Sequence, residues 1–125
     1  QCVLPISQSR PGLNAIIDCL SKSKISSFLS VLKRFGKDES NFSFPMEGYT
    51  LALDFPINSK TLKLADELDK ITLKYEGRFY LAKDSRMSAE TFKQSDQRIE
   101  KFISFRKKEN LIKIFNSSQS NRLKI

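Results

Sequence analysis

Residues 49–82 of the chain read YTLALDFPINSKTLKLADELDKITLKYEGRFYLA, and a change of periodicity within them decides the fold. Over 49–55, large apolar side chains alternate with small or polar ones, which predicts a strand that stops at the following proline. Over 59–75, apolar residues recur at helical spacing, which predicts an amphipathic helix that Gly77 ends. The apolar run at 78–82 predicts a further strand.

The rest of the chain extends this pattern in both directions. Residues 2–6 predict a first strand, and Ser9-Arg10-Pro11 opens a helix with proline near its start. Residues 26–35 predict a second strand, followed by a polar loop at 37–41, and Ser88 is a suitable N-cap for a terminal helical region. The order βαββαβ indicates an α+β fold: an antiparallel sheet of about four strands, helices mainly on one face, and a helical C-terminal tail. The other sheet face then needs cover from a ligand or from another part of the protein.

Composition is that of one globular domain. Hydrophobic residues make up 39% and charged residues 29% of the 125. No apolar run has the length of a membrane-spanning helix, and none resembles a signal peptide. The chain starts inside a predicted strand without methionine, and its four glycines are scattered, so no phosphate-binding loop is present. We therefore expect residues 1–125 to be a fragment of a longer protein.

The cysteines and histidines limit the chemistry. The chain has two cysteines and no histidine, which nearly excludes a zinc site. Cys2 and Cys19 are expected to be buried thiols rather than a disulfide. Without histidine, any proton transfer falls to lysine, tyrosine or a carboxylate.

The net charge of +8 is concentrated in the C-terminal third. Those basic residues could meet acidic lipid head groups or a phosphate-bearing substrate, or form a solvated face opposite an acidic partner domain. Nucleic acid is disfavoured as a partner, because exposed aromatic pairs are missing from the central strand, where Thr50, Ala52 and Asp54 share a face. The basic residues in question are Arg98, Lys101, Arg106, Lys107, Lys108, Lys113, Arg122 and Lys124.

Strand alternation selects the side chains that would line a site. Thr50 and Ala52 lie on the face away from the expected helices and are small enough to accommodate a ligand. On the preceding strand Lys33 stands among apolar neighbours, so it needs an anionic partner. That partner is either a substrate phosphate or Asp54 on the next strand.

Several ordered motifs resemble those of a known family. Residues 77–84 (GRFYLAKD) follow the pattern G-R-x-Y-x-A-K-D, and 28–36 (FLSVLKRFG) and 42–57 (FSFPMEGYTLALDFPI) resemble two further segments. The family is that of the FAD-linked oxidases of the vanillyl-alcohol-oxidase type, in the branch of the aldonolactone oxidases and decaprenylphosphoryl-ribose oxidases. The tail resembles it at Phe102, Arg106, Phe115, Ser117, Arg122 and Leu123.

The resemblance implies a C-terminal substrate (cap) domain whose FAD-binding domain lies elsewhere in the protein. It implies that Lys83 is the active-site lysine beside the flavin and the reacting hydroxyl, and that Tyr80 contacts flavin or substrate. It implies a substrate pocket that includes Lys33 and Val31, with Thr50 and Ala52 on the same face. The chain departs from the family at Ala52, where mycobacterial members have cysteine, at Asp96, commonly tyrosine, and at Asn110-Leu111, commonly Asp-Pro.

The implied reaction is oxidation of a secondary alcohol of a sugar or sugar lactone, with polyprenyl-phosphate-linked ribose as a candidate substrate for arabinose formation. The full-length protein would then be an FAD-dependent enzyme, in the cytoplasm or at the inner face of a bacterial membrane. The isolated fragment is expected to be inactive and able to self-associate. The alternative is a non-catalytic ligand-binding or assembly domain of the same basic α+β type.

Overall fold

A computed structural model describes residues 1–37 and 42–125. Four strands form one sheet in the order β2-β3-β1-β4, and every neighbouring pair is antiparallel. The α+β fold expected from the sequence is therefore confirmed, as is the order βαββαβ of its first six elements. These are β1 (Cys2–Pro5), α1 (Ile6–Ser23), β2 (Leu29–Phe35), β3 (Gly48–Asp54), α2 (Ser59–Lys74) and β4 (Arg78–Phe79).

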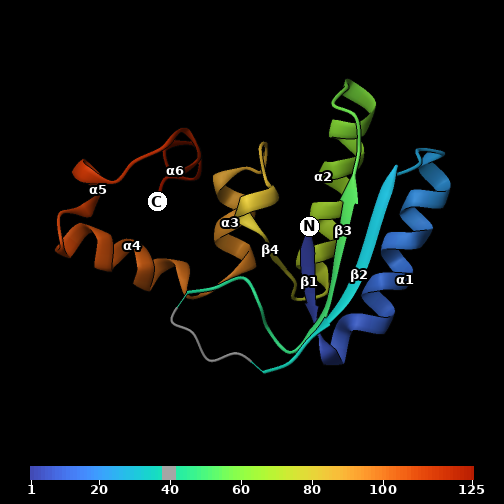
Figure 1. The fold of residues 1–125 in the computed structure, drawn as a ribbon, viewed down its shortest axis with the longest axis horizontal. Helices are drawn as coiled ribbons and strands as arrows, with labels where there is room; N and C mark the ends of the chain where they lie inside the picture. Colours follow the sequence, from blue (N-terminus) through green and yellow to red (C-terminus); the bar gives the residue numbers. More distant parts are fainter. Residues whose placement is uncertain (38–41) are drawn as a thin grey trace.

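Helices α1 and α2 contact each other and both contact β1, so they cover the same face of the sheet (Figure 1). Strand side chains such as Cys2 and Leu4 meet Ile16 of α1 in a buried cluster on this face. Leu51, Leu53 and Phe79 pack against the same cluster. The two helices thus cover the apolar side chains of β1 and β3, as the alternation predicts, whereas Leu32 of the edge strand β2 stays 55% exposed.

The remaining elements form a helical lobe beyond β4. It contains a 3-10 turn at Leu81–Lys83 and the helices α3 (Ala89–Ser95), α4 (Ile99–Lys108), α5 (Leu111–Ile114) and α6 (Ser118–Leu123). Figure 1 shows α4 and α5 on the side of α3 that is far from α1. A second buried cluster holds the lobe together and reaches β4 through Phe79; its buried members are Met87, Phe92, Ile99, Ile103 and Leu123.

Helix α2 begins at a capping box. The Asn58 side chain accepts hydrogen bonds from the Lys60 and Thr61 amides, and Thr61 accepts one from the Asn58 amide. At the other end Glu76, not Gly77, takes the left-handed conformation, with φ of 58°. Gly77 is required for close approach instead, since a Cβ there would lie 2.7 Å from Thr72 Cγ2 and 2.8 Å from the Val3 carbonyl oxygen.

Several expected boundaries were wrong. Helix α1 starts directly after β1, which places Pro11 inside the helix rather than near its start. Strand β4 ends at Phe79 instead of residue 82, because the Lys83 amide donates to the Tyr80 carbonyl and closes a 3-10 turn. Of the polar loop expected at 37–41, residues 38–41 lie outside the described residues.

One face of the sheet is not covered by α1 and α2, and we call it the outer face. Val31 pairs with Ala52 and Lys33 pairs with Thr50, and all four side chains lie on this face. Residues 42–47 cross this face. The Phe44 ring lies 5.8 Å from Phe35 on one edge strand and 4.8 Å from Tyr80 at the other edge, measured between ring centroids.

The outer face is therefore not open along its whole length. Thr50 is 1% exposed and Ala52 is 7% exposed, which contradicts the expectation that both would be accessible. Both side chains are small and lie on a central strand between two neighbours, and Thr50 is further covered by Gln1, whose Nε2 donates to its Oγ1 over 3.0 Å. Lys33 is exposed and Val31 is partly exposed, as expected.

Candidate functional site

The candidate site is built around the turn that carries Lys83. The 3-10 turn places Tyr80 and Lys83 three residues apart across one hydrogen bond of 3.0 Å. Tyr80 precedes the turn in an extended conformation, with φ of -88° and ψ of 105°, whereas Lys83 is the last residue of the turn. A continued strand would have directed the two side chains to opposite faces. The turn thus redirects Lys83 relative to a continued strand, while Tyr80 keeps the extended conformation of β4.

Asp84 fixes the backbone directly after Lys83. Its Oδ1 accepts hydrogen bonds from the Met87 amide over 2.9 Å and the Arg86 amide over 3.2 Å, and its Oδ2 accepts one from Arg122 over 2.8 Å. Partial burial of Asp84 disfavours its ionised form, but these donors outweigh that effect and hold the pKa of the carboxyl below its ordinary value. The anionic carboxylate therefore holds the turn closed at neutral pH.

The two arginines that flank Lys83 have structural partners. Arg86 bridges Asp66 and Asp69 of α2, with N···O distances of 2.9 and 2.7 Å. Burial raises the pKa of Asp69 above its ordinary value, although the Arg86 hydrogen bond opposes the shift. Arg78 donates to the carbonyl oxygens of Ser43 and Pro45, which holds the segment 42–47 over the outer face.

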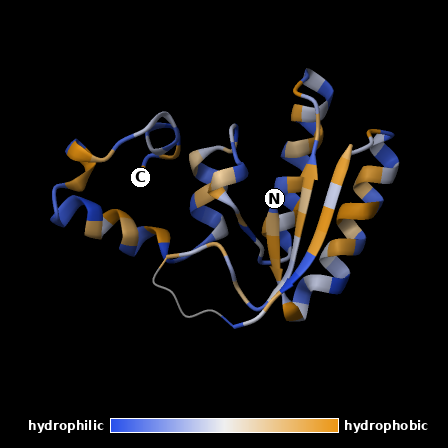
Figure 2. Ribbon diagram, viewed as in Figure 1, coloured by the Kyte–Doolittle hydropathy of each residue, from blue (hydrophilic) through white to orange (hydrophobic). Residues whose placement is uncertain are grey.

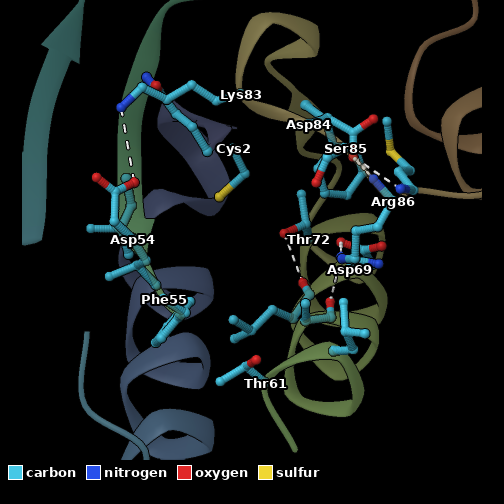
Figure 3. Close-up of a pocket in the computed structure, with 18 of the residues that line it drawn as sticks. Cys2, Asp54, Phe55, Thr61, Asp69, Thr72, Lys83, Asp84, Ser85 and Arg86 are labelled. Atoms are coloured by element: carbon cyan, nitrogen blue, oxygen red, sulfur yellow. Dashed lines mark hydrogen bonds and ion pairs between the residues drawn. The ribbon is translucent and has the colours of Figure 1, made fainter. Parts of the chain in front are cut away.

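Lys83 faces Asp54, the last residue of β3, with an Nζ–Oδ1 distance of 4.0 Å (Figure 3). The ion pair proposed between Lys33 and Asp54 is not formed; in the described part of the chain Asp54 pairs with Lys83 instead. At 4.0 Å the contact is longer than a hydrogen bond, so the lysine ammonium keeps its donors for a ligand. Nearly half of the Lys83 side chain is accessible.

Lys83 and Asp54 line a cavity of about 430 Å³ between the end of β3, helix α2 and the turn at 83–87. Its floor is apolar and includes Leu53 and Leu68. Figure 3 shows Asp54 and Phe55 on one side of it, with Asp69, Thr72 and Arg86 on the other. This volume is within the range of small-molecule sites.

The other predicted site residues do not line that cavity. Tyr80 lines a second hollow of about 170 Å³ together with Phe44 and Arg78. The outer face carries Val31, Lys33, Thr50 and Ala52. Asp54 lies on the same face, because it follows Ala52 by two residues on β3. Lys83 pairs with this Asp54. The structure therefore groups the predicted residues on one side of the sheet, with Lys83 where that side meets the cavity.

Sequence reasoning missed Phe44 and Gln1 as components of this side of the sheet. Phe44 belongs to the motif at 42–57, but the residues around it have no period that would place it on the sheet, and its position follows from rings at both sheet edges. Gln1 was treated only as the start of a strand, although the strand pairing places it opposite Tyr80, whose amide donates to the Gln1 carbonyl over 3.0 Å.

Two departures from the family pattern have clear structural roles. Asp96 accepts hydrogen bonds from Arg98, and its pKa lies below the ordinary value because these bonds outweigh the effect of burial. Asn110 takes the left-handed conformation, φ of 54°, between α4 and α5, a conformation that asparagine tolerates, and Leu111, at the position of the family's proline, is the first residue of α5. The motif tail is also explained: Arg122 binds Asp84, Leu123 is buried in the lobe, and Ser117 caps α6.

Within the described residues no group of three or more Cys, Asp or Glu side chains could hold a metal ion. Cys2 and Cys19 are free thiols, and Cys2 is buried. None of the helices in the described part of the chain is both long enough and apolar enough to span a bilayer.

The sequence of this domain is similar to part of an FAD-linked oxidase. The match extends over the whole chain: it is 36% identical over 126 aligned residues to part of decaprenylphosphoryl-beta-D-ribose oxidase of Mycolicibacterium smegmatis. A second relative, an uncharacterized protein in the mprA 5′ region of Streptomyces coelicolor, is 34% identical over 95 residues that cover 74% of the chain. The chain spans 27% and 26% of the length of these two curated relatives. No protein-family model matches the chain. The resemblance drawn from the motifs is confirmed.

Proposed function

We propose that residues 1–125 form the C-terminal substrate domain of an FAD-dependent oxidase that oxidises a secondary alcohol of a sugar or sugar lactone. The observation that carries this proposal is the match of the whole chain to part of an oxidase, combined with the position of Lys83, held by a 3-10 turn beside a cavity. The relative is named as an oxidase of decaprenylphosphoryl-beta-D-ribose, so the candidate substrate for this protein is a polyprenyl-phosphate-linked ribose, and arabinose formation is part of the proposal. The FAD-binding domain of the same protein would be the partner of the outer face.

The residues of the turn fit a flavin and a sugar. Lys83 offers ammonium donors to a hydroxyl or carbonyl oxygen, and Tyr80, 37% exposed, offers an aromatic surface supported by Phe44. FAD, when bound, accepts the hydride that leaves the alcohol carbon as the ketone forms. Lys33 and Val31, accessible on the outer face, would contact the sugar or its phosphate, beside the buried Thr50 and Ala52.

Lys83 acts on the hydroxyl proton in this proposal. It either accepts that proton as the carbon–hydrogen bond breaks, or stabilises the negative charge that develops as the proton leaves to another acceptor. Asp54 holds the lysine from the sheet side, and Asp84 holds the backbone behind it. The two roles differ in pH dependence, because only the base role requires the neutral amine.

The test compares Lys83→Ala with Lys63→Ala, an exposed lysine on α2, in the full-length protein. We expect the rate of flavin reduction by substrate, followed by rapid mixing, to fall by about 10²–10⁴-fold for Lys83→Ala and to be unchanged for Lys63→Ala. Flavin content should be normal in both variants. A near wild-type rate in Lys83→Ala, with bound flavin, would show that the catalytic centre is elsewhere. Substitutions of Arg78 and Arg86 should reduce stability more than rate, because both arginines bind structural partners.

The proposal includes a location and an assembly state. A protein that acts on a polyprenyl-linked sugar would work in the cytoplasm or at the inner face of a bacterial membrane. The 125 residues alone would be inactive, and the accessible part of the outer face would favour self-association of the isolated domain.

A further inference from the structure

The end of α4 and the helix α5 form a rigid projection at the far end of the lobe. Arg106 of α4 is buried, donates a hydrogen bond to the Phe115 carbonyl oxygen and lies 5.9 Å above the Phe102 ring. Asn110 reverses the chain between the two helices. The backbone of residues 111–115 is thus held against α4, so its side chains are displayed in a defined orientation.

Large apolar side chains cover this projection and are accessible to water. Ile114 is 67% exposed and Phe115 is 66% exposed, while Phe105 on α4 is 54% exposed and Ile112 is 39% exposed. Figure 2 shows α5 as a hydrophobic segment directly after the hydrophilic end of α4. Four large apolar residues exposed within eleven positions of sequence are more than the scattered single residues found on ordinary surfaces.

Lysines surround these apolar side chains. Lys101, Phe105 and Lys108 are spaced by four and three residues, so they form a stripe on the side of α4 opposite the buried Ile103 and Arg106. Lys107 and Lys113 are exposed next to them. Between residues 101 and 115 the acidic residue is Glu109, against four exposed lysines. We call Phe105, Ile112, Ile114, Phe115 and these four lysines the basic apolar tip.

We infer that the basic apolar tip docks on the surface of an anionic lipid bilayer. Aromatic and aliphatic side chains that enter the head-group boundary, together with lysines that meet acidic head groups, are the combination that interfacial helices use. The excess of four exposed lysines over one acidic residue between positions 101 and 115 favours an anionic surface as the occupant. The inference rests on the proposed function to the extent that a polyprenyl-linked substrate resides in a membrane.

The test measures co-sedimentation of the full-length protein with vesicles of phosphatidylcholine and phosphatidylglycerol, and with vesicles of phosphatidylcholine alone. We expect binding to the anionic vesicles that weakens at high salt. Each lysine contributes roughly fivefold to vesicle affinity. The triple variant Lys101→Gln, Lys108→Gln, Lys113→Gln should therefore bind on the order of 100-fold more weakly. The triple variant Phe105→Ser, Ile114→Ser, Phe115→Ser should weaken vesicle binding by at least about tenfold.

Matched control variants carry the same changes elsewhere. The triple variants Lys22→Gln, Lys60→Gln, Lys63→Gln and Ile6→Ser, Ile17→Ser, Leu32→Ser alter exposed residues outside the tip and should bind vesicles like the wild type. Equal loss in tip and control variants would overturn the inference, and so would the absence of vesicle binding by the wild-type protein. If the 125-residue chain binds vesicles but the full-length protein does not, another domain covers the tip and the inference is wrong. Flavin content and flavin reduction by a water-soluble substrate, measured on the same preparations, report on the proposed oxidase function separately.

Discussion

Asp84 is the residue on which the geometry of the lysine turn depends, and Asp84→Ala is the most informative single change. Alanine removes the acceptor for two backbone amides, those of Arg86 and Met87, and the partner of Arg122. The Asp84 side chain is 11% exposed and that of Arg122 is 28% exposed, so water replaces these contacts poorly. Two amide hydrogen bonds at about 1 kcal/mol each and one charged hydrogen bond of about 1.5 kcal/mol give an expected loss of about 3.5 kcal/mol in the free energy of unfolding.

Asp84→Asn separates the two parts of this loss. Asparagine keeps a carbonyl oxygen for the two amides but loses the charge opposite Arg122, so we expect a loss of about 1–2 kcal/mol. Urea unfolding of the chain, with unchanged slope, measures both values. Asp66→Ala is the control, because Asp66 also binds an arginine but its side chain is 63% exposed; it should cost less than about 1 kcal/mol.

The contribution of Asp84 to the free energy of unfolding depends on pH. The pKa of Asp84 in the folded protein lies below its ordinary value, so its contribution is complete above the unfolded pKa of about 3.9 and declines as the pH falls through the folded pKa. The difference between wild type and Asp84→Ala should therefore be constant near neutral pH and shrink in acid. A loss for Asp84→Ala no larger than that for Asp66→Ala, or a difference that grows in acid, would refute this account of the turn.

Three further outcomes are expected. Gly48→Ala should lower the free energy of unfolding by at least about 2 kcal/mol, because the new Cβ would lie 1.9 Å from the Leu4 carbonyl oxygen. Gly36→Ala, where a Cβ meets no atom within 4 Å, should change the free energy of unfolding by less than about 0.5 kcal/mol. Equal effects of the two variants in urea unfolding would contradict the pairing of β1 with β3. Burial raises the pKa of the Cys2 thiol, so a thiol reagent should label Cys19 rapidly and Cys2 only in denaturant; rapid double labelling of the native chain would count against the buried position of Cys2. Titration of FAD into the 125-residue chain should give weak binding or none, because the glycines form no phosphate-binding loop; tight stoichiometric binding would show that this segment carries the cofactor site itself.

The resemblance to the oxidases depended on short motifs that the structure now explains in part. Arg78, Asp84, Arg106 and Arg122 are motif residues whose hydrogen bonds hold the turn, the segment 42–47 and the tail. Lys83 is different, because its ion pair with Asp54 is long and its side chain is accessible. A motif residue without a demanding structural partner is the better candidate for function, whereas the arginines around it are accounted for by packing.

The sequence alone determined the elements and their order. The period of two in β3, the period of 3.6 in α2 and the N-cap at Ser88 act over a few neighbouring residues, so they can be recognised without the fold. The direction of the side chains on β3 was predicted correctly for the same reason, and the register with β2 confirms it.

Only the tertiary structure decided which residues meet. Lys83 and Asp54 are 29 positions apart, and Phe44 contacts both edges of the sheet from a segment with no periodicity of its own. Strand β4 likewise ends at Phe79, where the Tyr80 carbonyl accepts from the Lys83 amide and closes a 3-10 turn, although residues 78–82 have the composition of a strand. Local propensity is fixed by a residue and its neighbours, whereas the cover of the outer face and the partner of Lys83 depend on long-range packing that no local pattern encodes.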